Sequence, residues 1–262
     1  MNSILTPHFL VDNGRVRPRF ENARIGNEIA DHIAAELAPL GLVPDGPAFE
    51  RIFVDAVLAG QPDPDQAWIA FYASTLRRLR RPDRAGTGCV ATFGRIYAHV
   101  LSLIRGATVL DVGCCFGFLP LLAAERNPRL RVAGTDLVPS AAALAGRIAR
   151  SQGNGARFAA ADLLALPFAA RAADTVLAVH VLEHLPAGAS ARALAQLCRV
   201  ARRRVVVAVP LEETPDPTFG HRQAFDLPRL AAIGDIPGWS HAAYAADGGW
   251  LVLDRTAHSP IG

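Results

Sequence analysis

The residues best suited to bind a ligand lie in segment 107–118, where an acid and two glycines follow a short apolar strand. Asp111 ends the predicted strand, Gly113 and Gly117 form a tight turn, and apolar residues then recur at helical spacing. A turn without Cβ atoms lets the backbone approach a bound group, and the following helix begins with unpaired N–H groups. Strand, glycine turn and helix in this order indicate a nucleotide-binding half-unit.

A second group of residues has the chemistry to move a proton. His180 follows the predicted strand 173–179, and Glu183 and His184 come three and four residues later. A helical turn after His180 would bring the three side chains near one face. The alternative for Glu183 and His184 is a structural role in that turn. His221 is a further candidate, because histidine is the usual base near neutral pH.

Acids end the next two predicted strands. Asp136 lies 23 residues after Gly113, close to the spacing of a carboxylate that accepts hydrogen bonds from ribose hydroxyls. Its alternative role is to cap the helix predicted over 140–150. Asp162 follows the apolar segment that starts at Phe158.

The register Asp111-x-Gly113-x-Cys115-x-Gly117 resembles motif I of the class I methyltransferases, of the methyltransferase type 11 kind. That family uses S-adenosylmethionine (SAM) and releases S-adenosylhomocysteine (SAH). Cys115 replaces the family's middle glycine, which narrows the turn. The resemblance implies cofactor contacts for these residues: Asp111, Gly113, Cys115, Gly117, Asp136, Leu137, Asp162, Leu163 and His180.

The resemblance also implies a fold. It predicts an α/β protein with a doubly wound, seven-stranded Rossmann-like sheet of order 3-2-1-4-5-7-6, whose seventh strand is antiparallel. We expect a methyltransferase domain over 86–262 and a helical N-terminal extension over 1–85, acting as a lid or substrate region. Asn13-Gly14 predicts a hairpin in that extension.

Methyl transfer to a hydroxyl requires a base, for which we consider His184 first, His221 second and His180 third. A divalent metal held by these side chains is an alternative, since some sugar methyltransferases use one. Amino-methyltransferases of DNA and RNA carry Asn/Asp-Pro-Pro-aromatic where this chain has His180, and no Pro-Cys pair marks a 5-methylcytosine enzyme. We expect the remaining histidines, His8 and His32 among them, to be structural or exposed.

The acceptor is predicted less directly. The variant glycine turn and the segment 180–184 resemble the actinobacterial mycofactocin oligosaccharide methyltransferases, which methylate a glucose hydroxyl. The resemblance implies O-methylation of a small molecule or glycan, on which Trp68 and Tyr72 would stack. Two alternatives stay open: an RNA or protein methyltransferase that uses the arginines near residue 80, and a SAM-binding protein without catalysis.

Composition bounds these hypotheses. The net charge is only +3 and lysine is absent, so we expect no nucleic-acid partner. No apolar run is long enough to span a bilayer and no signal segment is recognised, which predicts a cytoplasmic protein. The four cysteines match no metal-binding spacing, and we predict no metal site.

Overall fold

The computed structural model describes residues 3–12, 15–19, 25–81 and 86–256. The chain forms two compact units: Met1–Ile96 with Asp216–His221, and Tyr97–Pro215 with Arg222–Gly262. The first unit extends past the boundary predicted at 85/86. The reason is local: the Cys89 N–H, at the start of α4 (Cys89–Leu103), donates to the Asp31 carboxylate.

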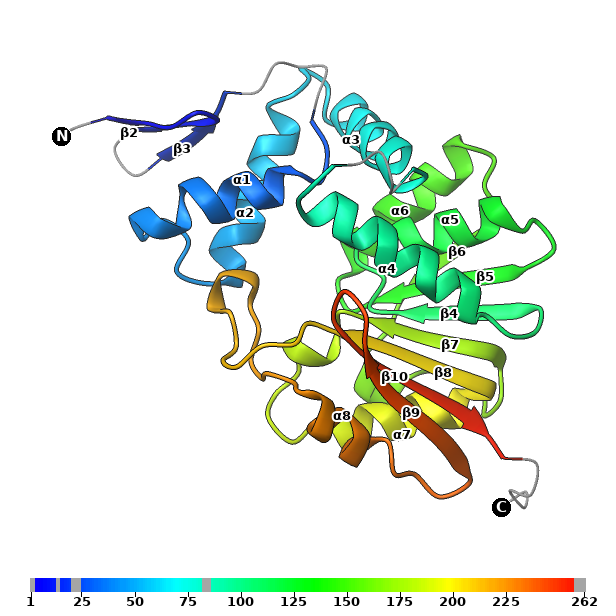
Figure 1. Ribbon diagram of the computed structural model, residues 1–262. Helices are drawn as coiled ribbons and strands as arrows, with labels where there is room; N and C mark the ends of the chain where they lie inside the picture. Colours follow the sequence, from blue (N-terminus) through cyan, green and yellow to red (C-terminus); the bar gives the residue numbers. More distant parts are fainter. Residues whose placement is uncertain (1–2, 13–14, 20–24, 82–85, 257–262) are drawn as a thin grey trace. The chain divides into compact units, whose positions relative to one another are not determined.

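The second unit is built on one seven-stranded sheet (Figure 1). Its strands are β4 (Thr108–Val112), β5 (Arg131–Asp136), β6 (Arg157–Ala160), β7 (Ala173–Val179), β8 (Ala201–Val209), β9 (Trp239–Ala245) and β10 (Gly249–Arg255). The order is β6-β5-β4-β7-β8-β10-β9, and β10 pairs antiparallel with β8. Numbered along the chain this is 3-2-1-4-5-7-6, so the predicted fold is confirmed.

Side-chain alternation along the strands gives this sheet two apolar faces. Leu110, Val176 and Val205 belong to a buried cluster with Leu194 of α7 (Ser190–Val200) and Leu230 of α8 (Leu227–Ile233). On the opposite face the His99 ring of α4 lies 4.5 Å from the Trp250 ring, centroid to centroid. The remaining helices are α5 (Phe118–Arg126) and α6 (Pro139–Ser151).

The first unit combines a small sheet with helices. Its elements are β1 (Ile4–Leu5), β2 (Phe9–Asp12), β3 (Arg15–Pro18), α1 (Ile29–Glu36), η1 (Ala38–Leu40), α2 (Gly46–Leu58) and α3 (Pro64–Leu79). The pairing of Asp12 with Arg15 confirms the predicted hairpin, whose turn residues Asn13 and Gly14 lie outside the described residues. Tyr72 is fully buried, so the expectation that it stacks on a sugar is wrong.

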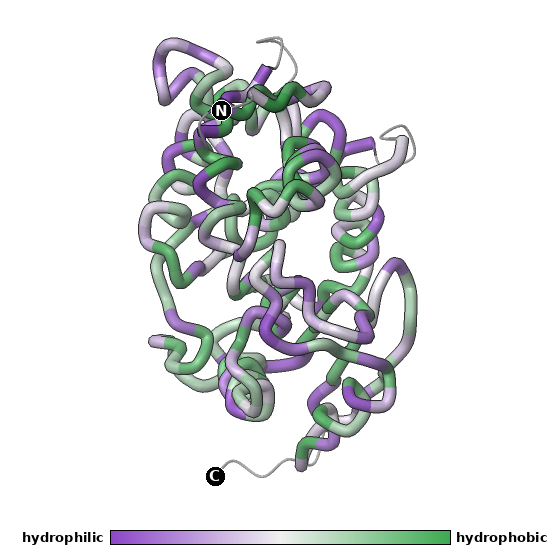
Figure 2. The backbone as a smooth tube through the Cα atoms, turned by 90° about the vertical axis from the view of Figure 1, so that its left-hand side faces the viewer, coloured by the Kyte–Doolittle hydropathy of each residue, from purple (hydrophilic) through white to green (hydrophobic). Residues whose placement is uncertain are grey.

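Hydrophilic and hydrophobic residues intersperse along the backbone (Figure 2). Among the described residues, no helix combines the length and apolar character that a membrane crossing requires.

Candidate functional site

The glycine turn connects β4 to α5 at the carboxyl edge of the sheet. Gly113 has φ +74°, and a Cβ built there would lie 2.5 Å from Cγ2 of Val181. Gly117 has φ +71° and its N–H donates to the Cys114 carbonyl at 2.7 Å. Both positions therefore require glycine. Cys115 also adopts a positive φ of +48°, so the family's glycine conformation persists there without glycine.

Asp136, at the end of β5, is fixed by two backbone donors. Its Oδ2 accepts the Cys115 N–H at 2.7 Å, and its Oδ1 accepts the Val138 N–H at 2.9 Å. The N-cap residue of α6 is Val138 and not Asp136, so the alternative capping role is wrong. The following Leu137 has 69% of its surface exposed, which is unusual for a large apolar side chain at a sheet edge.

Asp111 lies inside the sheet near this turn. Only 3% of its surface is exposed. Burial, reinforced by the charge of Asp136, raises the pKa of the Asp111 carboxyl well above its usual range. Burial and the charge of Asp136 thus both favour the protonated form of Asp111.

Asp162 follows β6 and caps the short 3-10 helix η3 (Leu163–Ala165). Its Oδ1 accepts the Leu164 N–H at 2.8 Å. The Leu163 side chain is buried in the core. One oxygen of the Asp162 carboxylate therefore caps η3.

His180 lies directly after β7, at the same carboxyl edge. Its φ is +54°, a strained value for a non-glycine residue, and its N–H donates to the Ala208 carbonyl at 2.8 Å. The ring Nδ1 is 3.3 Å from Oε1 of Glu183. Glu183 is fully buried, and among the described residues neither of its carboxylate oxygens accepts a hydrogen bond.

The predicted turn after His180 is present as the 3-10 helix η4 (Leu182–His184). It separates the side chains by exposure, because Glu183 points into the core while His184 is exposed. A Glu183 carboxylate oxygen and a ring nitrogen of His184 still lie within 4.8 Å of each other. The buried acid is therefore near both rings.

Gln223 is a positioning residue that the motifs did not single out individually. Only 4% of its surface is exposed, and its Nε2 donates to the Leu182 carbonyl at 2.7 Å. The Arg222 N–H donates to the Glu183 carbonyl at 2.7 Å. These contacts hold η4 in place. The signal was available, since both residues belong to the polar segment 219–226.

His221, the second predicted base, belongs to the other unit. It closes the segment Asp216–His221, whose η5 (Pro217–Phe219) lies with the N-terminal helices. The Phe219 and Phe49 ring centroids are 5.3 Å apart, and the His221 N–H donates to the Asp216 carbonyl. Asp226 caps the following helix α8, because its carboxylate accepts the Arg229 N–H at 2.7 Å.

Comparisons with known proteins agree with this geometry. Residues 109–204 match the family model described as a methyltransferase domain. A stretch of 68 residues is 43% identical to a demethylmenaquinone methyltransferase of Thermus thermophilus, covering 26% of this chain and 31% of that protein. The match thus spans about a third of that relative's length.

Two solved structures share the fold. Magnesium protoporphyrin IX methyltransferase of Synechocystis PCC 6803 with bound SAH matches with a TM-score of 0.54 and 20% identity, over 74% of this chain and 100% of that chain. The [4+2]-cyclase SpnF matches with a TM-score of 0.50 and 22% identity, over 66% of this chain and 82% of that chain.

Proposed function

We propose that this chain, whose residues 109–204 match a methyltransferase domain, is a SAM-dependent methyltransferase that acts on a hydroxyl of a small molecule or glycan. The observation that carries the proposal is the group of polar residues at one sheet edge. A glycine turn, the oriented Asp136 carboxylate and a buried carboxylate–histidine pair all follow strands whose carboxyl ends meet there. Open α/β sheets bind their ligands at this edge.

The residues at the turn fit SAM. Gly113 and Gly117 leave the backbone open to a bound group, and two N–H donors fix the Asp136 carboxylate. We assign Asp136 to the ribose hydroxyls and the exposed Leu137 side chain to the adenine face. We assign Oδ2 of Asp162 as the acceptor for the adenine amine, since Oδ1 of this carboxylate accepts the Leu164 N–H. SAM, when bound, supplies the methyl group.

His180 is the base that the geometry favours, ahead of His184. The Glu183 carboxylate faces Nδ1 of His180, which orients the ring and stabilises its positive charge once it takes a proton. The proton of the acceptor hydroxyl then moves to Nε2 as the methyl group reaches the oxygen. This atom is buried, so the acceptor must displace the side chains that cover it. His184 is exposed.

A glucose hydroxyl of a mycofactocin-type oligosaccharide is the acceptor that we propose, on the resemblance of segments 113–118 and 180–184. The half-buried Trp68 supports a sugar platform in the N-terminal unit. The relatives act on other molecules by name, a demethylmenaquinone and a magnesium porphyrin. SpnF shares the fold and is named as a cyclase. The second candidate function for this chain is therefore one without methyl transfer.

Calorimetry and isotope transfer test the proposal together. We expect the wild-type protein to bind SAM and SAH, and to move labelled methyl from SAM onto a glucose-containing oligosaccharide. Label in a lipid-soluble quinone or porphyrin fraction alone would contradict the glycan acceptor. Binding of SAM without transfer to any fraction of a host extract would favour the second candidate, and absence of SAM binding would refute the cofactor assignment.

A further inference from the structure

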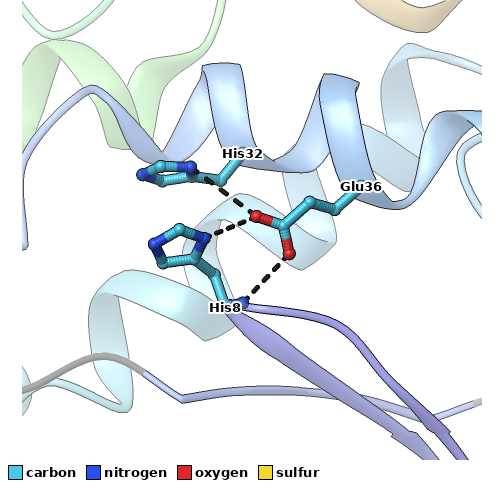
Figure 3. Close-up of side chains that lie close together, drawn as sticks. All are labelled: His8, His32 and Glu36. Atoms are coloured by element: carbon cyan, nitrogen blue, oxygen red, sulfur yellow. Dashed lines mark hydrogen bonds and ion pairs between the residues drawn. The ribbon is translucent and has the colours of Figure 1, made fainter.

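The side chains of His8, His32 and Glu36 lie close together in the N-terminal unit (Figure 3). His32 and Glu36 lie one turn apart on α1, and His8 directly precedes β2. Glu36 Oε1 is 2.5 Å from Nδ1 of His8 and 3.8 Å from Nδ1 of His32. The two imidazole rings stack with their centroids 3.7 Å apart.

We propose that His8, His32 and Glu36 bind a divalent metal ion of the zinc type, with water as the fourth ligand. One ligand atom from each residue lies within 4.8 Å of the other two. Zinc bonds to nitrogen and oxygen are about 2.0–2.2 Å long, which places tetrahedral ligand atoms about 3.3 Å apart. That separation falls between the two measured nitrogen–oxygen distances, so small side-chain rotations suffice.

The donor set favours zinc over magnesium or calcium. Two imidazoles with one carboxylate are typical of zinc sites, whereas the harder ions prefer oxygen ligands alone. The backbone N–H of His8 donates to Oε2 of Glu36 at 3.0 Å, which leaves Oε1 turned toward both rings. A carboxylate held in this way is oriented by the fold before the ion arrives.

Histidine and carboxylate side chains bind a metal in their deprotonated forms, so binding must displace a proton. The ion replaces the proton that His8 Nδ1 shares with Glu36, and that proton moves to Nε2 or to solvent.

The ion would tie the small sheet to α1. Strands β1, β2 and β3 hold two, four and four residues, and sheets this small are marginal without further support. The three metal-binding side chains are 35%, 30% and 13% exposed in the order His8, His32, Glu36, so an ion enters from solvent without unfolding. This site does not depend on the proposed methyl transfer.

Zinc titration of the full-length, chelator-treated protein tests the proposal. We expect one ion to bind at micromolar concentration, Co²⁺ to give the visible absorption of tetrahedral coordination, and zinc to raise the Tm. His32→Ala and Glu36→Gln should each weaken binding by more than about 100-fold, because loss of an outer-shell partner alone costs up to about that much. His241→Ala, at an exposed histidine of β9, is the matched control and should bind like wild type.

Nuclear magnetic resonance of the wild-type protein provides a second test, which does not require that any variant folds. Zinc should shift the ring signals of His8 and His32. Unshifted signals, no zinc binding, or binding that survives in His32→Ala and Glu36→Gln would each overturn the proposal. Binding lost in His184→Ala but retained in His32→Ala would place the ion elsewhere and would overturn it as well.

Discussion

Buried carboxylates at the two edges of the seven-stranded sheet differ in the hydrogen bonds that they accept. At the amino edge, Asp174 of β7 accepts the Ala107 N–H at 2.9 Å, the Thr108 hydroxyl at 2.9 Å and a guanidinium N–H of Arg202 at 2.7 Å. At the carboxyl edge, Asp111 faces the charge of Asp136, and Glu183 accepts no hydrogen bond among the described residues.

The pKa values follow this contrast. Burial alone would raise the pKa of Asp174, but the hydrogen bonds from Ala107, Arg202 and Thr108 hold it well below the usual range. The pKa of Asp111 is raised instead. One edge therefore uses its acid for stability, while the other retains buried acids at a cost to stability. Buried acids with perturbed pKa values cluster at functional sites, which supports the proposal of a ligand site at the carboxyl edge.

The largest expected effect is on turnover at the carboxyl edge. His180→Ala should lower kcat by about 10²–10⁴-fold with SAM affinity nearly unchanged, because a positioned base is worth that much. His184→Ala is the matched control and should retain most of the activity. Wild-type turnover by His180→Ala, measured with labelled SAM, would remove His180 from the mechanism.

Glu183→Gln separates positioning from packing. The substitution keeps the shape of a buried acid that accepts no hydrogen bond, so we expect unchanged or higher Tm together with lower kcat. A purely structural Glu183 predicts the reverse, a lower Tm with kcat intact.

The next effect concerns stability at the amino edge. Asp174→Ala should reduce the free energy of unfolding by about 3 kcal/mol, because a buried, charged hydrogen-bond acceptor is lost. The folded pKa lies below the unfolded value of about 3.9, so this stabilisation is fully present above that pH and is lost as pH falls through the folded pKa. Urea unfolding at neutral and acidic pH should show the difference shrinking; a pH-independent difference would contradict the ionic explanation.

A smaller change is expected in cofactor affinity. Asp136→Ala should weaken SAM binding by about 1.5–3 kcal/mol, the range for hydrogen bonds to a charged group. Calorimetry measures it, with thermal unfolding as a check that the turn stays folded without the Cys115 and Val138 contacts. Equal affinity in the two proteins would show that Asp136 does not hold the ribose.

The smallest expected effect is on stability at the carboxyl edge, where removal of a buried acid should have the opposite sign to Asp174→Ala. Asp111→Asn removes an acid whose charge is disfavoured by burial, so it should stabilise the ligand-free protein at neutral pH by about 1 kcal/mol. The folded pKa of Asp111 is raised, so the gain should grow as pH rises through that value and vanish below the unfolded pKa. Melting temperatures over this pH range check it, and a destabilised variant would indicate that the carboxylate is already compensated.

The sequence alone predicted the order of the strands. Motif I, the acids Asp136 and Asp162, and the segment around His180 are local patterns, each written within a few residues. Their succession predicted the sheet that the structure shows and the methyltransferase domain that residues 109–204 match. The cap formed by Asp226 is local in the same way, because its carboxylate and the Arg229 N–H lie three residues apart.

Only the tertiary structure decided which side chains meet. Arg202 and Arg204 of β8 form ion pairs with Asp174 of β7 and Asp254 of β10, which lie far from them in the sequence. The approach of Glu183 to His180, and of His8 to Glu36, also depends on contacts that no spacing rule contains. Burial and pKa arise from the whole packed environment, so the sequence can name candidate acids and bases but cannot rank them.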